Sequence, residues 1–250
     1  MERSEFLFAE MGLTRVAVDW WRLRMGGDGL SGVNGWRSAE RVNDYLSIVD
    51  SRPHKEEIRA VLLEQIPSNV NRVLDLGTGD GRLLALVKTK NPEAKGVALD
   101  FSDPMLELAR KRFAGDGSVE VVKHDLNDPL PKGRWEPFDL VISGLAIHHL
   151  PHERKRELYG EVFGLLRSGG LFLNLEHVAS ATETLHLRFL AAVGLTPETE
   201  DPANILLDME TQLKWLRQIG YKNVDCQWKW LEIALLTATK PQKQHNKNVG

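Results

Sequence analysis

The sequence has little cysteine, little net charge and no long apolar run, and each absence excludes a class of protein. Cys226 is the only cysteine among the 250 residues, which excludes an intrachain disulfide and a cysteine metal cluster. The formal net charge of −3 gives no global attraction to nucleic acid or to an anionic membrane. No apolar run reaches the roughly 18 residues of a membrane span, and the charged start does not resemble a secretory signal. We therefore expect a cytoplasmic protein without a membrane partner; a nucleic-acid partner is possible but not favoured, and the sequence indicates no oligomeric state.

What is present is typical of a globular chain with a full core, since 42% of the residues are hydrophobic and 27% are charged. The pattern divides the chain into an N-terminal helical cap, residues 1–50, and one main domain, residues 51–240. We expect a helical insertion at about 178–220 and a disordered polar tail, residues 241–250. Three of the seven tryptophans lie in the cap. Ordinary packing is the simpler expectation for them, and the alternative is that some wall a pocket; they are Trp20, Trp21 and Trp36.

Short apolar runs alternate with amphipathic helical patterns along the main domain, which indicates βαβ units and a parallel sheet. The five runs are 73–76, 96–100, 119–123, 138–143 and 171–175. The helix predicted over 153–166 is expected to end at Arg167-Ser168-Gly169-Gly170, because glycine favours a helix stop. Two further runs, 224–228 and 231–238, are joined too closely for a crossover and predict an antiparallel hairpin. The sequence therefore predicts an α/β fold.

The first of these runs leads into a glycine-rich loop, Gly77-Thr78-Gly79-Asp80-Gly81, which is followed by a helical pattern. Strand, glycine loop and helix together let a backbone approach a nucleotide-like ligand closely. The alternative is a tight turn that needs glycine only for its dihedral angles. Arg82 occupies the place of the third glycine of a dinucleotide fingerprint. With Asp75 and Asp80 nearby, the loop suits S-adenosylmethionine, which has an ammonium and a sulfonium and no phosphate.

Acidic residues end the next two strands at places that suit an adenosine. Asp100 lies 23 residues after Gly77, where an acid can accept hydrogen bonds from both hydroxyls of a ribose. Asp125 follows the third strand, where it is placed for an adenine amino group, and Phe101 is placed to cover an adenine face. Ligands in open α/β sheets bind outside the carboxyl ends of the strands. We therefore expect these side chains to converge on one crevice.

Taken in order along the chain, these motifs resemble those of the class I S-adenosylmethionine-dependent methyltransferases. The matching segments are 73–81, 99–100, 124–126, 138–150 and 166–172. The resemblance covers about residues 50 to 178, and the closing hairpin extends it. It implies a Rossmann-like domain with a seven-stranded, mostly parallel sheet, an antiparallel closing hairpin, helices on both faces and a helical cap. It also implies S-adenosylmethionine as cofactor and S-adenosylhomocysteine as product.

The resemblance further implies which residues bind that cofactor. The backbone of the glycine loop would pass beneath the methionine part, with Asp75 near its ammonium; a structural anchor of the loop is the alternative role for this acid. Asp100 would bind the ribose, and Phe101 would pack on the adenine. The remaining positions would border the adenine edge or the methionine end. The full set is Asp75, Gly77, Thr78, Gly79, Asp100, Phe101, Asp125, Leu126, Ser143 and Gly144.

Four residues are acid–base candidates: two follow the fourth strand, where this superfamily commonly places residues facing the acceptor, and two end the fifth strand and also face the crevice. They are His148, His149, Glu176 and His177. The alternatives are packing against the crevice, contact with nearby backbone, and polar lining of the pocket. With His152 the pair spells His-His-x-x-His, but no acidic partner helix or cysteine accompanies it and we expect no metal site. Methyl transfer from a sulfonium is an in-line displacement that depends on positioning, so a base is not strictly required.

We therefore expect a methyltransferase acting on a small-molecule acceptor enclosed by the caps. Residues 144–151 and 212–226 are also similar to a bacterial and archaeal group that includes uncharacterised members and relatives of carboxy-S-adenosylmethionine synthase, which serves tRNA wobble-uridine modification. A tRNA-modification enzyme of that kind, or an RNA methyltransferase, is one alternative. A nicotinamide oxidoreductase and a non-catalytic binding subunit are the others. The fourth strand runs into Ser143-Gly144-Leu145-Ala146 rather than an Asn-Pro-Pro-Tyr type motif, which argues against methylation of base amino groups.

Overall fold

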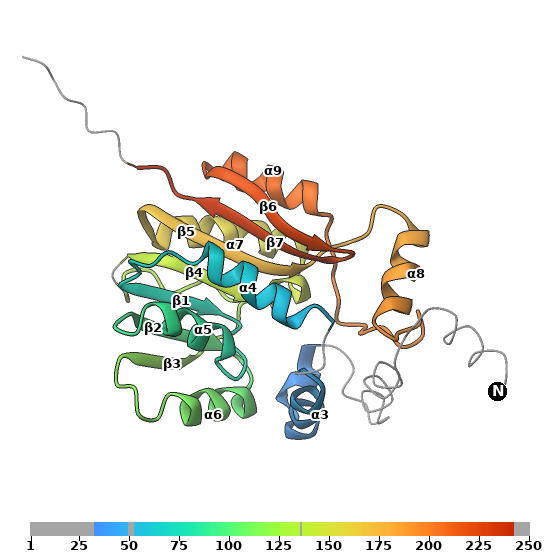
Figure 1. Ribbon diagram of the computed structural model, residues 1–250, viewed down its shortest axis with the longest axis horizontal. Coiled ribbons are helices and arrows are strands. Elements are labelled where there is room, and N and C mark those ends of the chain that lie inside the picture. The colour runs from blue at the N-terminus through green and yellow to red at the C-terminus, as the bar shows by residue number, and fades with distance from the viewer. Residues whose placement is uncertain (1–32, 50–52, 136, 243–250) are drawn as a thin grey trace, which may run out of the picture.

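The computed structural model describes residues 33–49, 53–135 and 137–242, which form one twisted sheet with helices on both faces (Figure 1). The strands lie in the order β3-β2-β1-β4-β5-β7-β6. β1 to β5 pair in parallel, and β7 is antiparallel to both β5 and β6. The strands are β1 Arg72–Leu76, β2 Lys95–Asp100, β3 Val119–Lys123, β4 Phe138–Gly144, β5 Leu166–His177, β6 Lys222–Trp230 and β7 Ile233–Thr239. The expected fold class and its closing hairpin are confirmed.

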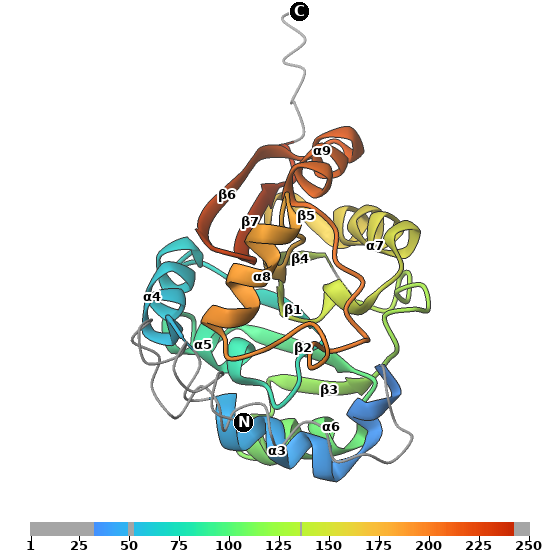
Figure 2. The same ribbon diagram turned by 90° about the vertical axis from the view of Figure 1, so that its right-hand side faces the viewer.

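Helices α4 and α5 cover one face of the sheet, and α7 and α9 cover the other. α6 packs beside β2 and β3 at one edge, where α3 lies against it (Figures 1 and 2). The helices are α3 Ala39–Val49, α4 Lys55–Gln65, α5 Arg82–Lys90, α6 Asp103–Arg112, α7 His152–Leu165, α8 Glu183–Ala192 and α9 Met209–Ile219. Two short 3-10 helices are η1 Val33–Arg37 and η2 Ile147–His149.

The sheet has a hydrophobic core on each face. Each buried strand contributes side chains to both cores, because successive side chains point to opposite faces of a sheet. In β1, Val73 packs toward α4 and α5, whereas Leu74 and Leu76 pack toward α7 and α9. All three are fully buried, and each such side chain contributes about 1.5–3 kcal/mol. Burial on both faces thus explains why Val73, Leu74 and Leu76 are all apolar, with Asp75 as the one interruption.

The chain between α7 and β5 differs from the sequence prediction. The helix ends at Leu165, and β5 begins at once, so that Arg167 to Gly170 lie within the strand rather than in a helix stop. Gly169 has a φ of +78° and its N–H donates to the Lys240 carbonyl over 2.9 Å. The pairing with β4 shifts register at this end of the strand. These glycines therefore belong to an irregular start of strand β5. In the sequence, the same glycine pattern is expected for a helix stop.

The predicted cap is described only in part, whereas the predicted insertion lies wholly within the described residues. η1 and α3 belong to the predicted cap, whereas Trp20, Trp21 and most of the predicted tail lie outside the described residues. Of the insertion, α9 packs against α7 and β6, and α8 stands apart beyond the carboxyl ends of β4 and β5 (Figures 1 and 2). The domain boundaries stay a prediction.

Candidate functional site

A cavity of about 640 Å³ lies at the carboxyl ends of the parallel strands. One end is lined by the glycine loop, by Asp100 and by residues after β3. The other end is lined by η2, by α8 and by the β6–β7 hairpin, and Figure 2 faces this side of the molecule. Trp36 of the predicted cap also lines the cavity. The volume falls within the range of sites that enclose small ligands.

The glycine loop connects β1 to α5 with three residues in the left-handed region. The φ angles are +66° at Gly77, +56° at Gly79 and +85° at Gly81. A Cβ at Gly77 would stand 2.2 Å from the Cβ of Ala146, so the segment after β4 packs directly on the loop. At Gly79 a Cβ would meet only Met105 Sδ at 3.9 Å, which leaves room beside the cavity. Glycine is therefore required by close packing at one position and by backbone conformation beside the cavity at the other.

The two acids of the loop region have partners within the protein. Asp75 Oδ2 accepts a 2.6 Å hydrogen bond from the hydroxyl of Thr78, and burial raises the pKa of this carboxyl to about 7. Asp80 Oδ2 accepts from Arg82 Nε over 2.7 Å and from Arg112 Nη2 over 2.6 Å. Asp80 lines the cavity, and Asp75 lies behind the loop. The contact with Thr78 fits the alternative role of Asp75 as an anchor of the loop.

Asp100 joins the glycine loop to the start of α6. Its Oδ2 accepts from the backbone N–H of Gly79 over 2.8 Å, and its Oδ1 accepts from the N–H of Ser102 over 2.9 Å. Burial raises the pKa of Asp100, although these backbone donors oppose the shift. The carboxyl lines the cavity. Its position at the end of β2 is the one predicted for the ribose.

The remaining cofactor candidates divide between the cavity wall and its support. Asp125 Oδ1 accepts from both the backbone and the side-chain nitrogen of Asn127, each over 2.9 Å. Phe101 lies under the guanidinium of Arg37, 5.6 Å from it. Ser143 is buried and donates to the Leu76 carbonyl over 3.0 Å, so its hydroxyl joins β4 to β1 behind the wall. The candidates that line the cavity are Gly77, Thr78, Gly79, Asp100, Phe101, Asp125, Leu126 and Gly144.

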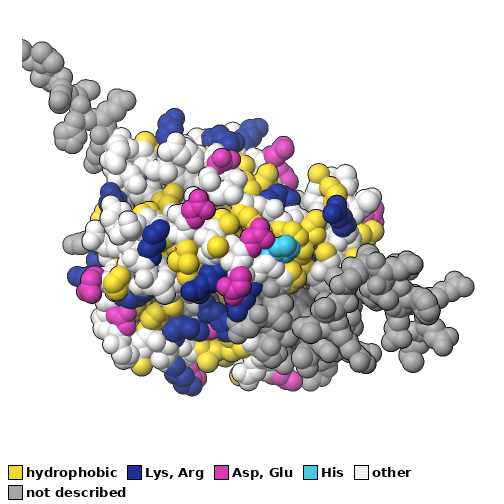
Figure 3. All heavy atoms as spheres, in the orientation of Figure 1, with side chains coloured by type: hydrophobic (Ala, Val, Ile, Leu, Met, Phe, Trp, Pro, Cys, Tyr) yellow, Lys and Arg dark blue, Asp and Glu magenta, His cyan; other side chains and the backbone are white. Residues whose placement is uncertain are grey.

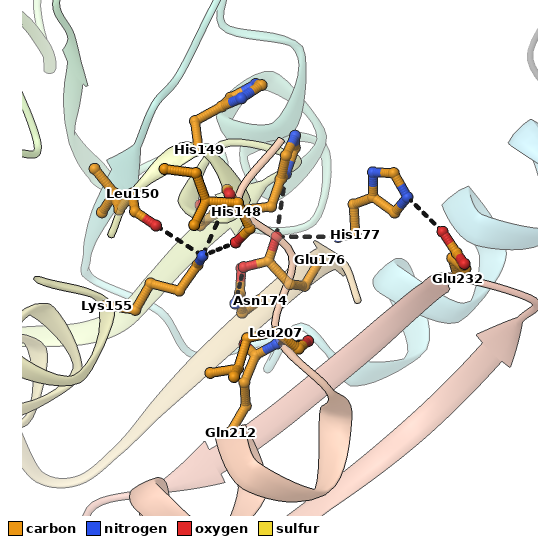
Figure 4. A network of polar contacts seen from close by, with 12 residues as sticks. His148, His149, Leu150, Lys155, Asn174, Glu176, His177, Leu207, Gln212 and Glu232 are labelled. Atoms are coloured by element: carbon orange, nitrogen blue, oxygen red, sulfur yellow. Dashed lines mark hydrogen bonds and ion pairs between the residues drawn. The ribbon is translucent and has the colours of Figure 1, made fainter. Parts of the chain in front are cut away.

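At the other end, His148 and Glu176 form a pair. His148 lines the cavity, and its Nδ1 lies 3.1 Å from Oε1 of Glu176. Glu176 is fully buried and also accepts from the His177 N–H over 3.0 Å and from Asn174 Nδ2 over 3.1 Å (Figure 4). Burial raises the pKa of Glu176 to about 7, while Asn174 and the charge of Lys155 oppose that rise.

Lys155 of α7 is a buried charged residue beside the site that the sequence reasoning missed. It is fully buried, and its Nζ donates to the carbonyls of His148 over 3.2 Å and Leu150 over 2.8 Å (Figure 4). It also donates to the carbonyl of Ile205. It thereby joins η2 to the segment before α9. Burial lowers the pKa of Lys155 to about 8, against the attraction of the Glu176 charge. The sequence feature that could have identified Lys155 is its position on the apolar face of α7, three residues before Leu158.

His177 has a second carboxylate partner that the sequence reasoning also missed. Its Nε2 lies 3.0 Å from Oε2 of Glu232, a fully buried residue in the turn between β6 and β7. The rings of His148 and His177 are 5.5 Å apart, and Figure 4 shows Glu176 between them. The ring of His149 lies 4.0 Å from that of His148 at an angle of 45°, and its Nδ1 donates to the Ala203 carbonyl over 3.1 Å. The three histidines line the cavity, and Glu176 contacts the ring of His148 and the backbone of His177.

The described part of the chain holds no group of three side chains suited to a metal ion. His152, the third histidine of the His-His-x-x-His run, contacts the Leu206 carbonyl through Nε2 over 3.1 Å. The three histidines of this run therefore contact different groups of the protein.

Comparison with known proteins adds three relatives. A family model described as a methyltransferase domain matches residues 73–170. A demethylmenaquinone methyltransferase from Clavibacter sepedonicus is 30% identical over 202 residues, which cover 74% of this chain and 78% of that protein. A carboxy-S-adenosyl-L-methionine synthase from Helicobacter hepaticus is 24% identical over 213 residues, which cover 76% and 87%. An uncharacterized methyltransferase from Anoxybacillus flavithermus is 31% identical over 147 residues, 58% of this chain and 66% of that protein.

Among solved structures, an O-methyltransferase family protein from Burkholderia thailandensis superposes with a TM-score of 0.69 at 18% identity. The superposition covers 96% of this chain and 71% of that one. At this identity the likeness concerns the fold. Some curated relatives are longer than the match, since the chain spans 46% of a trans-aconitate 2-methyltransferase from Rhizobium rhizogenes.

Proposed function

Because the chain belongs to the class I S-adenosylmethionine-dependent methyltransferases, we propose that it methylates a small protic acceptor with His148 as the general base. The methyl donor is S-adenosylmethionine and the product is S-adenosylhomocysteine. The observation that carries the proposal is the single cavity, which has the glycine loop and Asp100 at one end and His148 with Glu176 at the other. The family favours this chemistry over the nicotinamide oxidoreductase alternative.

The residues at the first end fit the donor. Room beside Gly79 admits a ligand close to the backbone, and the Asp100 carboxyl stands at the cavity wall. We assign the ribose to Asp100 and the adenine to Phe101, Asp125 and Leu126. The methionine part is assigned to the loop backbone and Gly144, with Asp75 and Ser143 as support. When bound, the donor supplies an electrophilic methyl group on a sulfonium.

His148 is oriented for proton transfer by its contact with Glu176. Nδ1 is held by the carboxylate, so the proton of an acceptor hydroxyl passes to Nε2. The deprotonated acceptor oxygen would then accept the methyl group of a donor held by the glycine loop and Asp100, with the electron pair of the broken carbon–sulfur bond left on the donor's sulfur. Glu176 then stabilises the imidazolium that forms. A positioned base of this kind contributes about 10²–10⁴-fold to a rate.

The acceptor end favours an apolar molecule that carries a hydroxyl. Its wall includes Phe189, Leu190 and Val193 from α8 and the segment after it, and Trp230 and Ile233 from the hairpin. Such a wall suits a ring better than an ion. A demethylmenaquinone methyltransferase among the relatives supports an apolar ring as the acceptor.

A nucleic-acid substrate is less well supported. Charged side chains of both signs are interspersed on the face shown in Figure 3, and the formal net charge is −3. The carboxy-S-adenosyl-L-methionine synthase relative keeps a role in tRNA modification as the second candidate. No helix in the described part of the chain is long and apolar enough to cross a membrane. We keep the cytoplasmic location as a proposal.

The proposal is tested in two steps. Calorimetric titration with S-adenosylhomocysteine should show one site, and folded protein that does not bind at millimolar ligand would refute the donor assignment. S-adenosylhomocysteine formation is then measured with a panel of phenols and hydroxyquinones. His148→Gln should keep ligand binding but lower turnover by about 10²–10⁴-fold, and Glu176→Gln should lower it less. Wild-type turnover in His148→Gln would remove the general-base assignment.

A further inference from the structure

Helix α8 is attached to the cavity by a row of four ionisable side chains from four segments. His177 of β5 contacts Glu232 of the hairpin turn, as described above. The other carboxylate oxygen of Glu232 lies 3.0 Å from Nδ1 of His186 on α8. Nε2 of His186 lies 3.1 Å from Oε2 of Glu200, in the segment after α8. His186 thus bridges two carboxylates, one beneath the helix and one at the cavity wall.

This geometry defines the protonation of His186. A neutral imidazole has one N–H, and its other nitrogen only accepts. Here both nitrogens face carboxylate oxygens, so two good contacts require the doubly protonated ring. Glu232 is fully buried, and a buried carboxylate is costly without a paired cation. The imidazolium of His186 meets that need, while His177 occupies the other oxygen of the same carboxylate.

The position of His186 relates this pairing to the acceptor end of the cavity. Phe189 and Leu190 follow it on α8 by one helical turn and are both buried in the cavity wall. Phe189 also packs 5.0 Å from the ring of His177. Glu200 itself lines the cavity. Loss of the bridge would therefore release the apolar wall and not the glycine loop.

We propose that protonated His186 is a latch that holds α8 over the acceptor end of the cavity and opens when the ring loses a proton. His186 and Glu232 are then positioning residues for acceptor binding. Calling that end the acceptor site rests on the proposed function, whereas the latch itself rests on the contacts of His186.

The direction of the pH response follows from the groups around the ring. Partial burial lowers the pKa of His186, but the hydrogen bond and charge of Glu232, together with Glu200, outweigh this and raise it. The latch is therefore complete below the ordinary pKa of histidine and is lost as the pH rises through the higher folded value. Asn204 Nδ2 contacts the other oxygen of Glu200 over 3.3 Å. Glu183 and Arg188, on α8 itself, are exposed.

The protonation is tested by nitrogen NMR of histidine-labelled, full-length protein. Both ring nitrogens of His186 should show imidazolium shifts at pH 7, above the point where a free histidine has lost its proton. Glu232→Gln and Glu200→Gln should each move this titration to lower pH. A neutral His186 ring at pH 6 would overturn the proposal, because the bridge then lacks its second donor.

The latch is tested by hydrogen exchange of residues 183–204, corrected for intrinsic rates. In wild type, exchange should be roughly threefold or more faster at pH 8.5 than at pH 6. In His186→Gln it should be fast at both, with S-adenosylhomocysteine affinity unchanged. Glu107→Gln, which removes an exposed carboxylate paired with Lys111 on α6, is the matched control and should match wild type. Equal protection in wild type and His186→Gln would overturn the latch.

These readouts separate the latch from the proposed function. If S-adenosylhomocysteine fails to bind while both His186 results hold, the function is wrong and the latch stands. If the ligand binds and exchange is unchanged in His186→Gln, the latch is wrong and the function stands. Should Glu232→Gln fail to fold, Glu200→Gln and His186→Gln carry the test, because both residues are partly exposed.

Discussion

At the scale of single residues, Asp100 is where the glycine loop and the proposed ribose site meet. Asp100→Asn replaces one acceptor by a donor, which then opposes a backbone N–H of Gly79 or Ser102. We expect S-adenosylhomocysteine affinity to fall about tenfold or more, since a hydrogen bond to a charged group contributes about 1.5–3 kcal/mol. Calorimetry measures this. Asp103→Asn is the control, because Asp103 is exposed and pairs with Lys123 at the surface. Unchanged affinity in Asp100→Asn would remove the ribose assignment.

Residues next to strand ends were predictable, and the partners behind them were not. The glycine loop and Asp100 follow directly from runs that the sequence identifies as strands. Glu232 is buried against its partners His177 and His186, which lie 55 and 46 residues earlier in the chain. Lys155 is likewise buried by carbonyls of a distant segment. Charge in a helix or turn predicts exposure, and only tertiary contacts reverse that prediction.

At the scale of elements, the strand–loop–helix unit combines two requirements for glycine. Gly77→Ala would place a Cβ 2.2 Å from that of Ala146 on a backbone with φ +66°. We expect the free energy of unfolding to fall by about 1–3 kcal/mol in urea titrations, through strain and overpacking. Gly160→Ala is the contrast, because a Cβ there meets nothing within 4 Å in helix α7. It should raise stability by about 0.5–1 kcal/mol. Equal effects of the two substitutions would contradict this account.

The helices of the insertion show what apolar periodicity does not predict, namely the surface against which a helix packs. The sequence predicts a helical insertion, and the structure has the helices α8 and α9 there. Spacing identifies the apolar face but not the surface that covers it. α9 turns Leu213 and Leu216 into the sheet core, whereas α8 turns Phe189 and Leu190 toward the cavity. Whether a helix of the insertion packs on the sheet or forms part of the cavity wall therefore depends on where the β6–β7 hairpin lies.

At the scale of the whole molecule, the proposed donor end of the cavity is a local product of the fold and the proposed acceptor end is not. The donor end comes from three successive strand–helix junctions of a parallel sheet, a geometry that sequence patterns predict. The acceptor end brings together η2, α8 and the hairpin turn, which span residues 147 to 233. No pattern within one of these segments encodes its distance from the others. This explains why the methyl donor was predictable and the acceptor was not.

Two fully buried carboxyls make the stability of the whole molecule depend on pH. Burial raises the pKa of Asp75 from 3.8 and of Glu176 from 4.5, each to about 7. The folded state therefore keeps protons that the unfolded state releases, so this stabilisation is complete at acid pH and lost as the pH rises through 7. Between pH 5.5 and 7.5 each group should cost about 1–2 kcal/mol of the free energy of unfolding.

Asp75→Asn and Glu176→Gln test this linkage, because neither amide releases a proton. Each variant should lose less stability than wild type between pH 5.5 and 7.5, as measured by urea unfolding at the two pH values. Asp116→Asn is the matched control: the hydrogen bonds from Lys88 and Ser118 hold the pKa of Asp116 at about 2, outside the interval. Its stability should change with pH in parallel with wild type. If all three variants run parallel to wild type, Asp75 and Glu176 are already ionised at pH 5.5, and the proton uptake inferred from their burial does not occur.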